Sequence, residues 1–410
     1  MLQRANKVSA LLASNKKRRV EATLDEDQTP RATLINRIAA LERDQAAQLS
    51  PSRSPSPTKS STRSTASDAS SSRRKFFLLD LGNEGIVKRQ LTGPRALHLP
   101  RAIKDALLRI QRLERYRGVL SAENNTPNME ALLDEFDLDQ AVFAEASDEG
   151  SRLTPESVDD IGSNAQRCFE MDHDEPVWNA EVHNPLLNKV FRTRGARLVD
   201  FSLCTTAQII KEYLPRPAPD KRIDFCLYID PRQDPDPSYS IKAESLREDL
   251  PQKSINHTSY GALHSYPMTV SVETERSGNN FDSAVLQIAV WQAAHWKMLR
   301  SLLHKAAPTV LAVSLDDTRS EAQYVSDALR ELGALHGIII QGHEWYYAAT
   351  SPELTSPDGT PSLRTILWLH QPIGRTNSGL GIHKIAAFLE FMKGWTASIY
   401  WPWFKKHVLN

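Results

Sequence analysis

In two segments of the chain, residues 222–230 and 268–276, apolar side chains recur at every second position. Both segments also carry acidic residues. The alternating apolar positions are Ile223, Phe225, Leu227 and Ile229 in the first segment and Met268, Val270 and Val272 in the second. A period of two is typical of a β-strand, because successive side chains point to opposite faces. Cys226 and Tyr228 make the other face of the first segment partly apolar, which indicates a strand inside a sheet. The chain is therefore constrained to a fold built around a sheet.

Three carboxylates lie on these predicted strands: Asp224 on the first, and Glu273 and Glu275 on the second. Glu273 and Glu275 share a face because they are two positions apart, and Asp224 joins them if the two strands are neighbours. Crowded carboxylates raise each other's pKa, and each unpaired buried charge is costly. Mg²⁺ relieves this cost, since it prefers one or two carboxylates with water and phosphate oxygens, the arrangement that phosphodiester hydrolysis uses. The alternative is that three unrelated acids face solvent on an edge strand.

Other periodic segments predict the elements around this pair. We expect helices over residues 97–117, 129–143, 174–191, 205–213, 281–304 and 380–392, with a loop from 143 to about 172. We expect further strands over residues 198–203, 309–314, 337–349 and 365–371. Strands clustered between helices predict an α/β (or α+β) fold with a mixed central sheet flanked by helices.

The net charge of zero conceals two charged blocks. Residues 1–75 hold 15 Lys/Arg against 7 Asp/Glu, and residues 121–175 hold 16 acidic groups against 2 basic ones. Residues 45–75 are also rich in Ser, Pro and Arg, which predicts disorder because such a segment buries too little apolar surface. We therefore predict a disordered arm over residues 1–80, a helical and acidic lead-in over 81–165, and one domain over 166–410.

The composition also bears on the cellular location. No apolar run approaches the roughly 18 residues that span a bilayer, and the N-terminus lacks the apolar core of a signal peptide. Cys168, Cys204 and Cys226 have no disulfide or metal-ligand spacing, so we expect reduced core residues. These features predict an intracellular protein. The basic run at residues 16–19 is compatible with nuclear import, although such runs are common.

The order of helix, strand, strand with Asp224 and strand with Glu273 resembles the PD-(D/E)XK nuclease superfamily. More closely, the chain is similar to fungal PD-(D/E)XK nuclease-like domain proteins over about residues 170–410. The matching positions include Trp178-Asn179, Val182-His183, Cys204-Thr205-Thr206-Ala207, Arg222-Ile223-Asp224-Phe225-Cys226, Ser254-Ile255-Asn256-His257-Thr258, Val272-Glu273-Thr274, Leu286-Gln287, Trp291, Gln341-Gly342-His343, Trp345, Gly381-Ile382 and Tyr400-Trp401-Pro402-Trp403.

The resemblance implies a role for several of these residues. Asp224 and Glu273 would hold Mg²⁺ or Mn²⁺, and Gln287 matches a glutamine on the helix after the second acid. Glu175 or Glu181 on the first helix would be an extra acid, and for both residues a helix cap or a surface acid is an equal alternative. The implied partner is a nucleic acid, DNA or RNA.

One position departs from the family pattern. The superfamily places Lys two residues after the second acid, where this chain has Glu275 followed by Arg276. Glutamate cannot offset negative charge at a phosphate, although it can act as a base or a ligand. The first hypothesis is therefore a metal-dependent nuclease, an endonuclease-like hydrolase with Asp224, Glu273, Glu275 and Gln287 as its site. The alternatives are a catalytically inactive nucleic-acid-binding or protein-interaction module, and a purely structural domain.

A working nuclease would also need a basic rim for the phosphate backbone. The candidates are Arg192, Arg194, Arg197, Lys211, Lys221, Arg222, Arg276, Lys297 and Arg300. Side chains that scatter over the fold would favour the inactive module.

Overall fold

The computed structural model describes residues 84–91 and 99–410, apart from 125–137, 146–148, 193–196, 217, 219–221, 279–280, 314–317 and 356–361, together with Arg74, Phe76 and Asp80. All of these belong to one compact unit, residues 62–410. The predicted disordered arm except for these three residues, the basic run at 16–19 and most of the predicted helix 129–143 lie outside the described residues. The end of that helix is a short 3₁₀ turn, Gln140–Val142.

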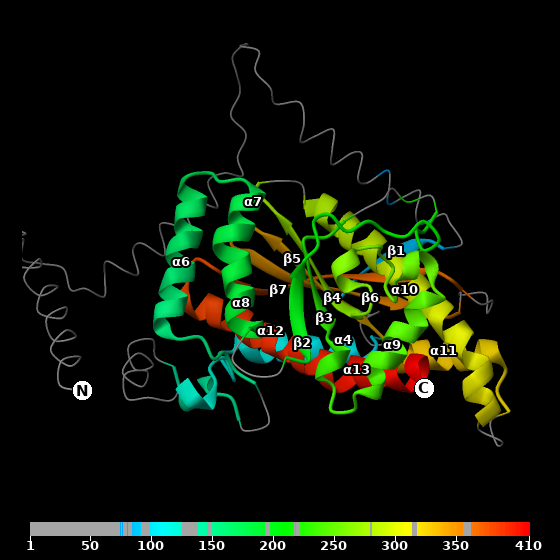
Figure 1. Ribbon diagram of the computed structural model, residues 1–410. Helices are drawn as coiled ribbons and strands as arrows, with labels where there is room; N and C mark the ends of the chain where they lie inside the picture. Colours follow the sequence, from blue (N-terminus) through cyan, green and yellow to red (C-terminus); the bar gives the residue numbers. More distant parts are fainter. Residues whose placement is uncertain are drawn as a thin grey trace, which may run out of the picture. The chain divides into compact units, whose positions relative to one another are not determined.

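Seven strands of the described residues form one mixed sheet (Figure 1), in the order β1-β7-β6-β5-β4-β3-β2. Their bounds are β1 (Ile86–Gln90), β2 (Val199–Leu203), β3 (Phe225–Ile229), β4 (Met268–Glu275), β5 (Leu335–Gln341), β6 (Glu344–Pro352) and β7 (Thr365–Arg375). The pairs β1–β7 and β4–β5 are parallel, and the other four pairs are antiparallel. The predicted α/β class with a mixed sheet is confirmed, as is the pairing of the two acidic strands.

Helices cover both faces of the sheet. Their bounds are α4 (Arg101–Glu114), α6 (Pro155–Glu170), α7 (Glu175–Trp178), α8 (Asn184–Phe191), α9 (Ser238–Glu248), α10 (Phe281–Val313), α11 (Glu321–Leu332), α12 (Gly379–Trp395) and α13 (Trp401–Phe404). On one face, Trp296 of α10 donates its indole hydrogen bond to Thr350 of β6 at 2.9 Å. On the other, Phe388 of α12 packs edge-to-face against Tyr347 of β6, with ring centroids 5.6 Å apart. Helices α10 and α11 together make the crossover that joins the parallel strands β4 and β5.

Three predicted elements in this unit are wrong. Residues 205–213 form turns rather than a helix, because Ile210 donates its backbone hydrogen bond to His257 at 2.8 Å and Ile209 forms a bridge with Thr258. Residues 309–313 continue α10 past Pro308 instead of forming a strand. The predicted strand 337–349 is two strands, β5 and β6, joined by a tight turn at Gly342.

The expected loop up to residue 172 is also wrong, since α6 fills most of it. Thr154 caps this helix by accepting the backbone hydrogen bond of Ser157, and Pro155 occupies its first turn. The buried positions Val158, Ile161, Ala165 and Cys168 recur at helical spacing. The acidic residues of this stretch lie mainly on the opposite, solvated side, so the block of negative charge does not prevent packing.

The buried core accounts for the cysteines and for the aromatic C-terminal residues. All three cysteines are free and buried, as predicted. Trp401, Trp403 and Phe404 are at most 3% exposed, so docking of the C-terminal residues explains them. Among the helices that the structure describes, none combines the length and the apolar character that a membrane span requires.

Candidate functional site

Asp224 directly precedes β3 and is only 7% exposed. Its Oδ2 accepts two hydrogen bonds from Thr274 of β4, one from the backbone N–H at 2.8 Å and one from the hydroxyl at 2.8 Å. Thr274 stands between Glu273 and Glu275. Just before β3 begins, the side chain of Asp224 thus accepts the backbone hydrogen bond of β4 that a neighbouring strand would otherwise accept. This point is the centre of the candidate site.

Glu175, the first residue of α7, contacts Asp224 from the side. Its carboxylic acid donates a hydrogen bond to Asp224. Burial, followed by the negative charges of Asp224 and Glu275, raises the pKa of Glu175 to about 7. Burial also raises the pKa of Asp224, against the hydrogen bonds from Thr274 and Glu175, which lower it. The two carboxyl groups therefore hold one proton between them close to neutral pH, as interacting buried acids do.

Glu273 and Glu275 face helix α10. Ser271, two residues before Glu273, pairs with Gly337 of β5. A Cβ at Gly337 would lie 3.1 Å from the side chain of Gln292 of α10, so this face of the sheet is the one that α10 covers. Alternation along the strand puts Glu273 and Glu275 on this same face. Glu273 is 3% exposed, and Glu275 at the end of the strand is half-buried.

The register relates the two predicted metal ligands. Phe225 of β3 pairs with Val272 of the antiparallel strand β4. Asp224, one residue before Phe225, therefore lies opposite Glu273, one residue after Val272. The acid that touches Asp224 is Glu175, for which the sequence also allowed a surface or capping role. The charge of Glu275 reaches the same pair, because it contributes to the raised pKa of Glu175.

Gln287 lies on α10, the helix that covers the face of Glu273. It is half-buried, and within the described part of the chain it makes no hydrogen bond. Trp291, one turn further, is 1% exposed and packs edge-to-face on His257 with ring centroids 4.4 Å apart. Trp291 is therefore a core residue, whereas the role of Gln287 stays a prediction.

A buried polar chain supports Asp224 from behind. Asn179 donates a hydrogen bond from Nδ2 to the hydroxyl oxygen of Thr274 at 3.0 Å, which orients the hydroxyl hydrogen toward Asp224. Nδ1 of His183 lies 2.9 Å from Oδ1 of Asn179. Burial lowers the pKa of His183 to about 3, so this histidine is neutral and donates through Nδ1.

Sequence reasoning did not assign a function to these supporting residues. Asn179 and His183 are four positions apart on the first helix, in a π-helical segment, Asn179–His183 (η4), that precedes Pro185. π-Helical turns are frequent at functional sites. The spacing of two polar residues on an otherwise apolar helix face was the signal available.

The predicted basic rim does not gather around the acids. Arg194 and Lys221 lie outside the described residues. Arg192 pairs with Asp200 at 3.0 Å, Arg276 pairs with Asp172 at 3.2 Å, and Lys297 and Arg300 line a separate cavity. The described candidates are therefore spread over several elements.

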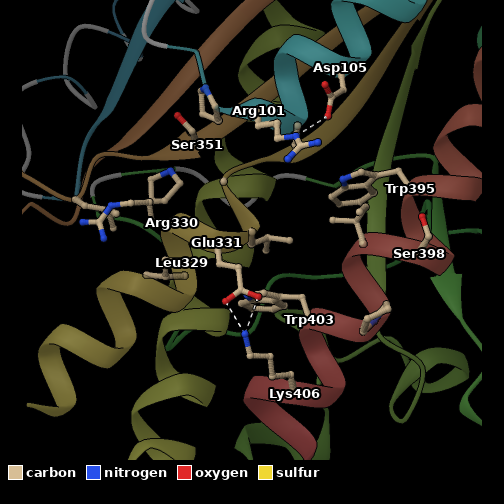
Figure 2. A pocket seen from close by; sticks show the side chains of 18 residues that line it. Arg101, Asp105, Leu329, Arg330, Glu331, Ser351, Trp395, Ser398, Trp403 and Lys406 are labelled. Atoms are coloured by element: carbon tan, nitrogen blue, oxygen red, sulfur yellow. Dashed lines mark hydrogen bonds and ion pairs between the residues drawn. The ribbon is translucent and has the colours of Figure 1, made fainter. Parts of the chain in front are cut away.

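Another cavity, of about 760 Å³, lies away from the acids (Figure 2). The first turn of α4, the end of α11 and the C-terminal helices line it, with Trp395 and Trp403 in its wall. Lys406 is held there by Glu331 at 2.9 Å. None of the four predicted site residues contributes to this cavity, so it is not part of the candidate site.

A divalent cation fits the donor chemistry of the site. In the described residues no group of three or more His, Cys, Asp or Glu side chains is arranged to hold a metal ion. Mg²⁺ needs fewer protein ligands, since one or two carboxylates with water and substrate phosphate suffice. The contact between Glu175 and Asp224 brings two hard oxygen donors together in a buried place, where the alternative to a cation is a shared proton.

Comparison with known proteins identifies one family. The family model described as PD-(D/E)XK nuclease superfamily matches residues 127–401. No curated protein and no solved structure matches the chain. The matched range begins before α6 and includes every strand from β2 to β7.

Proposed function

The chain belongs to the PD-(D/E)XK nuclease superfamily, and on that premise we propose that it is a metal-dependent nuclease that hydrolyses phosphodiester bonds in DNA or RNA. Nucleases of this superfamily generally depend on divalent metals. The observation that carries the proposal is the pair of carboxyl groups at the end of β4, the buried Asp224 and the half-buried Glu175. Strongly shifted pKa values of this kind are common at functional sites.

The proposal gives each acid a role. Asp224 and Glu273 are the proposed ligands of Mg²⁺ or Mn²⁺, and Glu175 is a further acid beside them. A bound divalent cation would polarise the phosphoryl group and lower the pKa of a bound water. Thr274 and Asn179 hold the carboxylate of Asp224 in one orientation, and Gln287 is available to a phosphate oxygen from the side of α10.

Glu275 is the residue that counts against catalytic activity. It stands where the superfamily pattern has Lys, and its carboxylate adds negative charge where a phosphate must approach. Arg276 does not replace the missing cation, because alternation places it on the opposite face and it already pairs with Asp172 at 3.2 Å. This position favours the second candidate function, a catalytically inactive module of the same fold that binds nucleic acid or protein.

Two features of the sequence before residue 76, its net positive charge and a basic run, also support this function. The first 75 residues carry a net charge of +8, which suits attraction to a phosphate backbone. The basic run Lys16-Lys17-Arg18-Arg19 would direct the protein to the nucleus.

The deciding experiment measures cleavage of labelled single- and double-stranded DNA and RNA in Mg²⁺, in Mn²⁺ and in excess chelator. We expect cleavage that requires metal and that falls below detection in Asp224→Asn and Glu273→Ala. Glu181→Gln is the matched control, since Glu181 lies on the same helix as Glu175 but forms an exposed ion pair with Arg167. This variant should cleave like the natural chain.

The opposite result would identify the inactive module. If folded protein cleaves none of these substrates, the hydrolase proposal fails. Glu275→Lys then becomes the variant to test, because it restores the positive charge that the family pattern contains. Metal-independent cleavage that persists in Asp224→Asn would indicate a contaminating nuclease.

A further inference from the structure

A second cavity, of about 220 Å³, lies beside the middle of α10, at the end of the sheet opposite the carboxyl pair. Its walls come from α10, from Glu84 ahead of β1, and from the junction of β6 and β7. Arg300 of α10 lies 13 residues after Gln287, roughly 20 Å along the helix. The cavity is therefore separate from the proposed nuclease site.

Basic side chains dominate this cavity. Lys297, Arg300, Arg364 and the exposed His304 line it, and Glu84 is the acid among the described lining residues. A cluster of cations around a small concave space attracts anions, because their fields add in a region that water screens poorly.

Among the described residues, two of these cations form ion pairs, and the third has only the more distant charge of Glu84. Lys297 pairs with Glu84 at 2.8 Å, and Arg364 pairs with Asp80 and, at 3.9 Å, with Glu353. The guanidinium of Arg300 forms no hydrogen bond or salt bridge with a side chain or carbonyl that the structure describes. Burial lowers the pKa of its guanidinium, and the charge of Glu84 offsets this only in part.

An arginine stays charged even when it is half-buried, so it cannot escape this cost by losing its proton. Loss of hydration without a compensating ion pair is unfavourable. A guanidinium also presents a planar fork of donors that matches the oxygens of a phosphate. Ser301 also lines the cavity, but its side chain already hydrogen-bonds Tyr213.

The larger cavity of Figure 2 shows that a pocket with basic residues need not have unpaired charge. There Arg101 pairs with Asp105 at 3.7 Å and Lys406 is held by Glu331. Arg330, which also lines it, pairs with Asp327 at 2.6 Å. Arg300 differs from these three cations, since no salt bridge joins it to another described residue.

We propose that the cavity lined by Lys297, Arg300 and Arg364 binds a phosphate-type anion, either inorganic phosphate or the terminal phosphate of a larger molecule. Arg300 supplies the bidentate contact, and Lys297 supplies a second charge. Trp296 and Leu363 make the apolar part of the wall. This site is independent of the proposed cleavage, because it involves none of the acids at the end of β4.

Thermal unfolding of the full chain in increasing inorganic phosphate, with chloride added to constant ionic strength, tests the proposal. We expect a saturable rise in Tm, as binding to the folded state requires. Arg300→Gln should weaken the apparent phosphate affinity at least tenfold, and Arg300→Lys should weaken it less. Arg101→Gln, which removes an exposed arginine of α4, is the matched control and should respond like the natural chain.

Phosphate also stabilises proteins without a site, by exclusion from their surface. An equal rise in Tm in the natural chain and in Arg300→Gln would therefore overturn the proposal, as would no saturable rise in the natural chain. If Arg300→Gln does not fold, calorimetric titration of phosphate into Arg300→Lys gives the same comparison. Titration with a 5′-phosphorylated dinucleotide and with its unphosphorylated form separates a nucleic-acid end from free phosphate as the source.

Discussion

At the scale of single residues, the shared proton of Asp224 and Glu175 makes stability depend on pH. The pKa of Glu175 is raised from its ordinary value near 4.5 to about 7 in the folded chain. The folded state therefore binds more protons than the unfolded state between about pH 4.5 and pH 7, and stability falls as pH rises through this window. Above pH 7 the loss is complete.

Replacement of this acid should remove that dependence. We expect Glu175→Gln to be more stable than the natural chain at pH 8 and to show a flatter stability profile between pH 5 and pH 8. Urea unfolding at both pH values measures the difference. Glu181→Gln should keep the natural profile, and an unchanged profile in Glu175→Gln would show that the pair does not share a proton.

The sequence predicted the positions of the candidate acids on their strands but not their contacts. Alternation places Glu273 and Glu275 on one face, whereas the role of Asp224 and Glu273 as metal ligands comes from the family resemblance and stays a prediction. The contact between Asp224 and Glu175 could not be predicted, because it joins positions 49 residues apart and depends on how α7 approaches the end of β4. The hydrogen bond from the hydroxyl of Thr274 to Asp224 could not be predicted for the same reason, because it forms only where β3 begins beside β4.

At the scale of elements, the hairpin of β5 and β6 depends on Gly342 in its turn. Gly342 has φ +56°, and a Cβ there would lie 1.9 Å from the hydroxyl oxygen of Ser277. Its N–H donates to the carbonyl of Glu275 at 3.0 Å, which ties the turn to the end of β4. The turn therefore supports the strand end that carries the candidate acids.

Gly342→Ala should destabilise the protein by about 1–3 kcal/mol, because alanine is disfavoured at positive φ and its methyl group collides with Ser277. Chemical denaturation provides the measurement. The double variant Gly342→Ala with Ser277→Ala should recover part of the loss, since it removes the collision but not the backbone strain. No recovery would assign the whole effect to the backbone.

The elements that the sequence predicted correctly are those whose apolar period is long or strict. Strands β3 and β4 and helix α12 are of this kind. The sequence predicted a strand over residues 309–314, but residues 309–313 belong to a helix already established by the preceding turns. The sequence predicted a helix over 205–213, but the backbone there bonds instead with the segment around His257. Tertiary contacts overrode local preference at residues 205–213, and continuation of an existing helix did so at 309–313.

At the scale of the whole molecule, residues 1–61 and 62–410 separate into two units. Removal of residues 1–61 should therefore leave Tm within about 2 °C of the natural value, which is roughly the shift that 1 kcal/mol causes in a domain of 150–250 residues. Removal of residues 1–91 should lower it by more, because it deletes β1 and the buried side chain of Ile86, which is 1% exposed. Calorimetry of the two truncated chains compares them. Equal melting temperatures would mean that β1 is dispensable.

The pairing of β1 with β7 also sets an order of events during synthesis. Ile86 pairs with Thr365, roughly 280 residues later, which the ribosome adds in about 15–60 s at ordinary elongation rates. For that interval the first strand of the sheet has no partner, while β2, β3 and β4 can already associate. The nascent chain thus carries an open strand edge until late in translation, and assistance from chaperones would matter most before β7 emerges.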